Sequence, residues 1–171
     1  MHIKEETAER HTLSVLVDNE PGILARIAGL FTARGYNIES LTVSDVTADK
    51  AVSRLTIVTS ASAATMEQIL AQLDRLVPVH SVIDLTALGP HVERELALVK
   101  VAGVGEHRIE ALWLGDVYRA RVVDATVSSF VFEVTGTPEK VDKFCELMRE
   151  VGLVEVARTG VAAIARGREA A

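Results

Sequence analysis

Hydrophobic positions near the start of the chain change their period across a short polar turn. Leu13, Val15 and Val17 occupy alternate positions of TLSVLV, which predicts a β-strand. Over residues 22–34 the apolar positions recur at intervals of three and four, which predicts an amphipathic helix. These apolar residues are Ile23, Leu24, Ile27, Ala28, Leu30 and Phe31. Gly35 follows the last of them, where glycine commonly ends a helix.

The rest of the first half adds a hairpin, a second helix and a further strand. Residues 36–46 and 51–60 are rich in β-branched side chains and flank the polar TADK, which predicts two paired strands. A helical pattern of apolar residues follows, at Met66, Ile69, Leu70, Leu73 and Leu76. Pro78 then precedes a predicted strand over residues 79–88. The predicted order is therefore β-α-β-β-α-β.

The same order of elements repeats after the segment LGPHVER, residues 88–94. Gly89 and Pro90 make this segment the best candidate for a domain boundary. Beyond it we predict strands over 95–103, 117–126, 128–136 and 153–159, and a short helix over 106–114. A last helix is predicted to begin with Thr137 as N-cap and Pro138 as its first residue. The chain is thus predicted to be α+β, with two halves of similar architecture and little residue identity.

Composition and charge narrow the class of protein. The chain has 171 residues, of which 49% are hydrophobic and 4% aromatic, so aliphatic side chains must build the core. The net charge of −6 provides no broad positive field, which argues against nucleic acid as a partner. Apolar runs fall far short of the roughly 20 residues that span a bilayer, and the first eleven residues do not resemble a signal peptide. A single cysteine, Cys145, excludes an intrachain disulfide, and we expect a cytoplasmic protein.

Residue types that usually carry catalysis form no recognisable motif. Histidines at positions 2, 11, 80, 91 and 107 do not have metal-ligand spacing with one another or with Cys145. Cys145 falls on the apolar face of the last predicted helix, which favours a buried structural thiol over a nucleophile. In GVGEHR, Arg108 stands where the dinucleotide fingerprint requires a third glycine. We therefore expect no metal, no bound nucleotide and no catalytic residue on this chain.

The turn DNEPG, residues 18–22, is the best candidate for ligand binding. If Pro21 is the first helical residue, the backbone N–H groups of residues 22–24 belong to the unpaired first turn, which carries partial positive charge. Gly22 has no side chain to keep an anion away from them, and the Asn19 amide can donate or accept. On the pentapeptide alone, a helix capped by Asn19 or Glu20 is favoured over an anion site.

A longer context favours the ligand site. The stretch DNEPGILARIAGLFTARGYNIESLTV resembles the start of an ACT domain, in which a Pro-Gly turn opens the first helix and a Gly-Tyr-Asn-Ile-like stretch begins the second strand. Three stretches in this order, RGYNIESLTV, HVERELALVKV and VEVARTGVAAIARG, resemble the small regulatory subunit of acetolactate synthase (acetohydroxyacid synthase). The resemblance extends from about residue 11 to residue 168.

The resemblance implies two ferredoxin-like βαββαβ domains in tandem, an ACT domain over residues 11–88 and a second ferredoxin-like domain over 91–168. It also implies that the ACT domain dimerises and binds a branched-chain amino acid, principally valine, at the subunit interface. The positions that match the effector contacts of the family, or adjoin them, are Asn19, Gly22, Ile23, Leu24, Asn37 and Ile38. Whether Asn37 reaches the effector within one chain or across the dimer stays open.

The function that the resemblance implies is that of a non-catalytic regulatory subunit. Such a subunit activates the catalytic (large) subunit of acetolactate synthase and confers feedback inhibition by valine or another branched-chain amino acid. Thiamine diphosphate, Mg and FAD are expected on that catalytic partner, and no cofactor is expected on this chain. The alternatives are a free-standing ACT amino-acid sensor that acts on another protein, and an independent enzyme with an unrecognised site. The preferred effector, the docking surface and the stoichiometry stay open.

Overall fold

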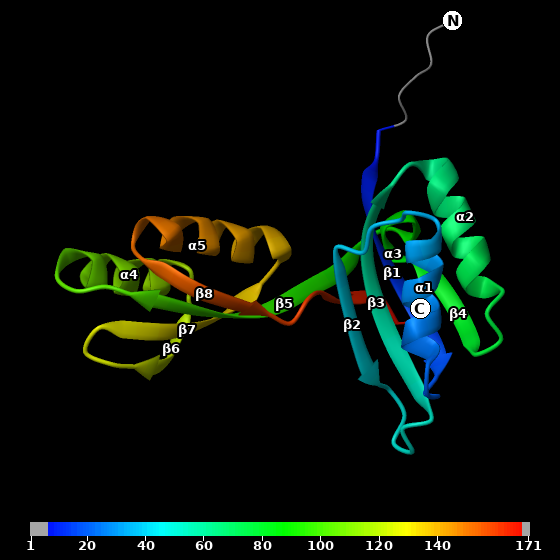
Figure 1. Ribbon diagram of the computed structural model, residues 1–171, viewed down its shortest axis with the longest axis horizontal. Coiled ribbons are helices and arrows are strands. Elements are labelled where there is room, and N and C mark those ends of the chain that lie inside the picture. The colour runs from blue at the N-terminus through cyan, green and yellow to red at the C-terminus, as the bar shows by residue number, and fades with distance from the viewer. Residues whose placement is uncertain (1–6, 169–171) are drawn as a thin grey trace, which may run out of the picture. The chain divides into compact units, whose positions relative to one another are not determined.

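The computed structural model describes residues 7–168, so part of the N-terminal segment considered above lies outside the described residues. The chain forms two compact units (Figure 1). One unit comprises the chain up to Val92 together with the segment that begins at Val161, and the other comprises Glu93–Gly160. Each unit contains an antiparallel sheet whose strands alternate with helices in the predicted order, which confirms the α+β class.

The first unit has a sheet of strand order β2-β3-β1-β4. Its elements are β1 (Glu9–Asp18), α1 (Ile23–Ala33), β2 (Ser40–Asp45), β3 (Val52–Ala61), α2 (Ala63–Asp74), β4 (Val79–Asp84), α3 (Leu85–Leu88) and β9 (Ala162–Ala165). In the pairing of β1 with β3, Leu13 lies opposite Ile57 and Val15 opposite Leu55. These four side chains are buried on one face of the sheet, against the apolar faces of α1 and α2. The period-two and helical patterns therefore identify this core correctly.

The predicted strand over residues 79–88 is only partly correct. The strand β4 ends at Asp84, and the next four residues form the single helical turn α3. The Asp84 carboxylate accepts hydrogen bonds from the N–H groups of Thr86 and Ala87, at 3.0 and 3.2 Å. This capping stabilises a helical turn where the β-branched and aliphatic composition alone suggests a strand.

The C-terminal segment returns to the first unit as the unpredicted strand β9. Val161 and Ala163 are buried in a small cluster with Val58 and Leu85. The Val161 backbone also bonds to β2, since its N–H donates to Ser40 Oγ at 2.9 Å and its carbonyl accepts from Thr42 Oγ1 at 2.8 Å. The compact units therefore differ from the predicted domains 11–88 and 91–168, because these contacts bring the segment after residue 160 into the first unit.

The second unit has the strand order β6-β7-β5-β8, which repeats the order of the first. Its elements are β5 (His91–Ala102), of which the first two residues belong to the first unit, α4 (Glu106–Val117), β6 (Arg121–Ala125), β7 (Ser129–Gly136), α5 (Pro138–Glu150) and β8 (Leu153–Arg158). The strand β9 also pairs with β5. The start of α5 follows the prediction, because Thr137 is its N-cap and accepts from the Lys140 N–H, and Pro138 is its first residue.

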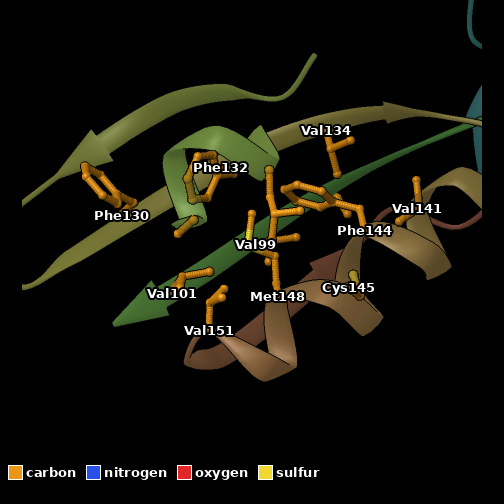
Figure 2. Packing of buried hydrophobic residues seen from close by; sticks show 13 residues of the cluster. Val99, Val101, Phe130, Phe132, Val134, Val141, Phe144, Cys145, Met148 and Val151 are labelled. Carbon is orange, nitrogen blue, oxygen red and sulfur yellow. The ribbon is translucent and has the colours of Figure 1, made fainter. Parts of the chain in front are cut away.

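The expectation that aliphatic side chains build the core is wrong for the second unit, where the rings of Phe130, Phe132 and Phe144 are buried (Figure 2). Phe132 of β7 and Phe144 of α5 pack edge to face with ring centroids 6.0 Å apart, a favourable geometry for two aromatic rings. Val99 of β5 and Met148 of α5 are fully buried in the same cluster. Cys145 is also buried there, as predicted. In the described part of the chain, no helix is long and apolar enough to cross a membrane.

Candidate ligand-binding site at the start of helix α1

The helix α1 begins at Ile23, and Gly22 is its N-cap residue with φ 88° and ψ −6°. The prediction that Pro21 is the first helical residue is wrong, because Pro21 lies in the preceding turn. The dihedral angles of Gly22 lie in the left-handed region and not in the helical region, and glycine adopts this conformation at little cost. A Cβ added at Gly22 would meet no atom within 4 Å, so the space beside this residue is open.

No side chain caps this helix. The Asn19 amide bonds elsewhere, and the Glu20 carboxylate pairs with the Arg26 guanidinium at 3.0 Å. The Ile23 N–H donates to the Glu20 carbonyl at 3.3 Å, but within residues 7–168 no hydrogen bond uses the N–H groups of Leu24 and Ala25. The capping interpretation of DNEPG is therefore wrong, and two first-turn donors with partial positive charge are open to a ligand.

The Asn19 side chain connects the end of β1 to the hairpin between β2 and β3. Its amide nitrogen donates to the Lys50 carbonyl at 2.9 Å and to Asp45 Oδ1 at 3.3 Å. The Asn19 backbone N–H donates to the Ala51 carbonyl at 2.8 Å. Because both amide hydrogens face protein acceptors, the Asn19 side chain can only accept a hydrogen bond from a ligand. Asp45 and Lys50 are parts of this site that the sequence did not predict. Lys50 belongs to the polar turn TADK, whereas Asp45 falls in the predicted strand over residues 36–46.

The predicted apolar contacts divide between the core and the surface. Ile23 is 7% exposed and belongs to the core of the first unit. Leu24 is 44% exposed and lies beside the open N–H groups. Ile38 is half-buried and packs against the same core as Ile23. Of the predicted aliphatic contacts, Leu24 therefore offers the most accessible side chain to a ligand at the start of α1.

Asn37 lies beyond the opposite end of α1 from Gly22. The helix has 11 residues, which corresponds to a length of about 16 Å. The Asn37 carbonyl accepts from Thr59 Oγ1 at 2.6 Å, near the end of β3, whereas Asn19 bonds to Ala51 just before the start of β3. Within one chain, the structure therefore does not bring Asn37 together with Asn19 and Gly22.

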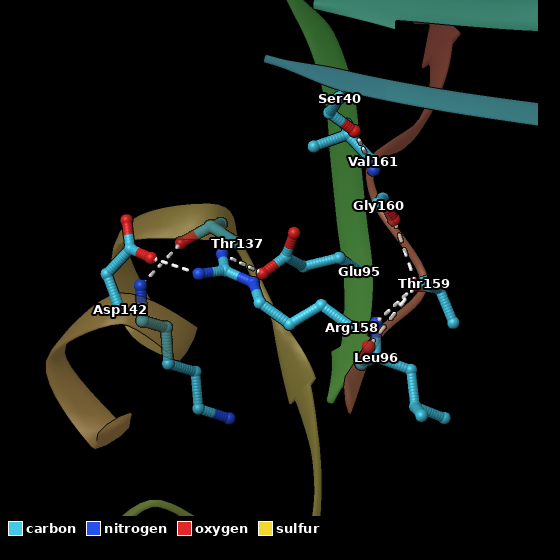
Figure 3. Close-up of polar contacts among 10 residues, drawn as sticks. Ser40, Glu95, Leu96, Thr137, Asp142, Arg158, Thr159, Gly160 and Val161 are labelled. Atoms are coloured by element: carbon cyan, nitrogen blue, oxygen red, sulfur yellow. Dashed lines mark hydrogen bonds and ion pairs between the residues drawn. The ribbon is translucent and has the colours of Figure 1, made fainter. Parts of the chain in front are cut away.

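A second polar cluster, in the second unit, was not anticipated from the sequence (Figure 3). The Arg158 guanidinium bonds to the carboxylates of Glu95 and Asp142, and the Glu95 side chain is only 3% exposed. Burial alone would lower the pKa of Arg158, but the hydrogen bonds to Asp142 and Glu95 outweigh it and raise this pKa. The guanidinium is therefore held in its charged form, which compensates the buried carboxylate.

Among residues 7–168, no cluster of His, Cys, Asp and Glu could hold a metal ion. Burial is the main cause that raises the pKa of the Cys145 thiol, so the neutral form is favoured. The arrangement at α1 instead suits a small zwitterion, because open N–H donors lie at the start of the helix and an amide oxygen is available from Asn19.

Comparisons with known proteins match both units. The model "AHAS small subunit-like ACT domain" matches residues 13–81, and "Small subunit of acetolactate synthase" matches residues 94–167. The probable acetolactate synthase small subunit of Archaeoglobus fulgidus is 46% identical over 160 residues, which cover 94% of this chain and 99% of that protein. The acetolactate synthase isozyme 3 small subunit of Escherichia coli is 45% identical over 159 residues, which cover 92% and 96%.

A solved structure agrees with these sequence comparisons. The crystal structure of the acetolactate synthase small subunit from Thermotoga maritima has a TM-score of 0.84 and 36% identity, and the match covers 94% of this chain and 99% of that chain. The first unit therefore contains an ACT domain, and the chain belongs to the class of ACT-domain regulatory proteins. More narrowly, the chain belongs to the family of acetolactate synthase small subunits.

Family membership confirms the predicted resemblance, the tandem ferredoxin-like fold and the role of a regulatory rather than catalytic subunit. Membership of this small-subunit family implies that the chain has a catalytic partner subunit and that it carries no cofactor itself. The alternative of a free-standing amino-acid sensor is not favoured.

Proposed function

We propose that the first unit dimerises, binds a branched-chain amino acid at the start of α1, and so regulates the catalytic subunit of acetolactate synthase. The observation that carries the proposal is the pair of open N–H groups on Leu24 and Ala25, next to the open space at Gly22. An anion placed there gains two backbone donors and the partial positive charge of the helix start.

Each group of an α-amino acid has a complementary partner at this position. The carboxylate accepts from the N–H groups of Leu24 and Ala25. The ammonium donates to the Asn19 side-chain oxygen, close to the negative charge of Asp45. An aliphatic side chain packs on the exposed part of Leu24. Valine is the effector that the family resemblance favours, and discrimination from leucine or isoleucine is limited to about 1 to 3 kcal/mol per methylene.

The second asparagine of the proposed site comes from the other chain of a dimer. The strand β2 is an edge of the sheet, and exposed apolar side chains accompany it and the start of α1 at Leu24, Val43 and Val46. Two chains that associate through this edge about a twofold axis bury these side chains. The antiparallel arrangement places the start of α1 in one chain near the end of α1 in the other. The partner's Asn37 then reaches the effector bound at Gly22.

Regulation follows if the effector favours one of two arrangements of the holoenzyme. A coupling free energy of about 1 to 3 kcal/mol between the effector site and the catalytic site is typical of such systems. The catalytic subunit carries the thiamine diphosphate, Mg and FAD that we expect in the holoenzyme. An effector that bound both arrangements equally would not change the activity. The cytoplasmic location stays a prediction.

Reconstitution tests this function. The purified chain is mixed with the purified catalytic subunit of the same organism, and acetolactate formation is followed with and without valine, leucine or isoleucine. We expect the activity to rise on mixing and to become sensitive to at least one of the three amino acids. The catalytic subunit alone, with the same amino acids, is the control. Activity that neither rises nor becomes sensitive contradicts the proposal.

A further inference from the structure

The helix α4 of the second unit, whose place in the chain is labelled in Figure 1, has buried apolar side chains on one side and exposed apolar side chains on the other. Ala111 and Leu114 are buried against the sheet. On the outward side, four large apolar side chains stay exposed, namely Ile109 at 70%, Leu112 at 38%, Trp113 at 62% and Val117 at 56%. Several large apolar side chains exposed together on one face commonly mark a site that another molecule covers. The outward face of α4 therefore has the composition of a surface that is covered by a partner.

The charges on this face have one sign. Glu106, Glu110 and Asp116 are exposed and share the outward face with the apolar residues. Glu106 and Glu110 border a shallow hollow with Ile109 and Trp113. A partner that covers this face must therefore pair apolar side chains with Trp113 and place basic side chains opposite the carboxylates.

The basic side chain nearest in sequence does not neutralise this face. The Arg108 guanidinium lies 3.9 Å above the centre of the Phe130 ring and donates to the Val127 carbonyl at 3.2 Å. Both contacts turn Arg108 back toward its own unit, where the cation–π contact and the hydrogen bond hold it. The outward face consequently combines a strongly apolar centre with a negative border.

A second copy of this chain is a poor occupant for the face. In a twofold contact the same patch meets itself. An antiparallel pairing of two α4 helices centred on Trp113 sets Glu110 of one chain opposite the partner's Asp116, and the reverse. A parallel pairing sets each glutamate opposite its own copy. Both arrangements oppose like charges at the border of the contact, which disfavours them. Charge complementarity thus requires a different protein.

We infer that the outward face of α4 is a docking surface for the catalytic subunit, at an apolar site bordered by lysine or arginine side chains. This inference rests on the proposed function, because that function supplies the protein that the small subunit must bind. Trp113 is the central anchor, since buried tryptophans commonly dominate the binding free energy of interfaces. The acidic border sets orientation and the rate of association.

Alanine variants of the full chain test the surface. Binding of the purified catalytic subunit is titrated by calorimetry for the unchanged chain, for Ile109→Ala and for Trp113→Ala. Val154→Ala is the matched control, because Val154 is an aliphatic side chain of the same unit, 60% exposed on β8 rather than on α4. We expect Trp113→Ala to weaken binding at least about tenfold, Ile109→Ala to weaken it less, and Val154→Ala to leave it unchanged. Thermal unfolding should be nearly unchanged, since the altered side chains are exposed.

A charge reversal gives a second readout. The triple variant Glu106→Lys, Glu110→Lys, Asp116→Lys should weaken binding at low salt, and the difference from the unchanged chain should shrink as salt is added.

The possible results separate this inference from the function on which it rests. If the unchanged chain binds and Trp113→Ala binds equally well, α4 is not the docking surface and the regulatory function stands. If the unchanged chain does not bind the catalytic subunit, both fail. If Trp113→Ala instead lowers the molar mass of the isolated chain in sedimentation equilibrium, the face is a contact between copies of this chain, which overturns the inference.

Discussion

The Asn19 side-chain nitrogen donates a hydrogen bond to the Lys50 carbonyl oxygen at 2.9 Å, between the end of β1 and the turn that joins β2 to β3. A second bond from the same nitrogen reaches Asp45 Oδ1 at 3.3 Å. These bonds hold the side chain in one orientation and leave its oxygen as the only group for a ligand. Asn19 therefore has a structural role and a proposed binding role at once.

Asn19→Ala and Asn37→Ala should both weaken effector binding, but only Asn19→Ala should lower the stability of the chain. Asn19→Ala removes both bonds to the hairpin, and we expect it to lower the free energy of unfolding by about 1 kcal/mol. Asn37 is exposed and contributes its carbonyl, not its side chain, to the bond with Thr59, so Asn37→Ala should leave the stability unchanged. Urea denaturation measures the first quantity and calorimetric titration with valine the second. Equal stability losses would contradict these roles.

Gly22→Asp should abolish inhibition by valine while activation of the catalytic subunit persists. The new carboxylate occupies the open space beside the first-turn N–H groups and repels the effector carboxylate. Gly22→Asn is the control, because asparagine has nearly the same size, carries no charge and tolerates the left-handed conformation that Gly22 adopts. Steady-state assays with increasing valine measure both variants. If Gly22→Asn loses inhibition as completely as Gly22→Asp, backbone strain or crowding, and not charge, is the cause.

Mixed dimers test whether the effector site spans two chains. Chains with Gly22→Asp and chains with Asn37→Ala are each expected to bind valine poorly. When they are mixed and allowed to exchange, a mixed dimer regains one intact site if Gly22 of one chain acts with the partner's Asn37. With random exchange, about one quarter of all sites should recover. Calorimetry on the mixture gives the recovered fraction, and no recovery would contradict a site shared between Gly22 of one chain and Asn37 of the other.

Arg158→Met should destabilise the second unit by about 3 kcal/mol, because it leaves the Glu95 carboxylate buried without its cation. This value is at the lower end of the usual range, since Arg158 itself is about one third exposed. The double variant Glu95→Met, Arg158→Met should regain most of the loss. Lys100→Met is the control, because its pair with Glu155 is exposed to solvent and contributes little to stability. Urea denaturation of all three variants checks these values.

Cys145 should react with a thiol reagent only when the second unit opens. Burial raises the pKa of the Cys145 thiol, so the neutral, unreactive form persists to a higher pH than for an exposed cysteine. We expect labelling at pH 8 to be at least about 100-fold slower in the native chain than in urea, because reaction requires an opening of the fold. Cys145→Ala gives the background. Fast labelling of the native chain would show that the core around Phe144 is open.

The predictions that succeeded depend on residues close together in sequence. The start of α5 followed from Thr137 and Pro138, which act on the turn that they begin. The start of α1 was mispredicted by two residues, because the rule for Pro21 ignored the left-handed conformation of Gly22. The strand predicted beyond Asp84 failed because a side-chain cap outweighed the composition of the next four residues.

The sequence by itself determined the βαββαβ order within each half, the buried faces of the main strands and helices, and the presence of a glycine at the start of the first helix. Period and local hydrogen bonding specify these features, since they involve neighbours a few residues apart. Only the tertiary structure decided that Asn19 is held by Lys50, that the Asn37 carbonyl bonds to Thr59, and that Val161 returns to the first unit. These relationships depend on strand register and on helix length, which place residues distant in sequence together or keep them apart.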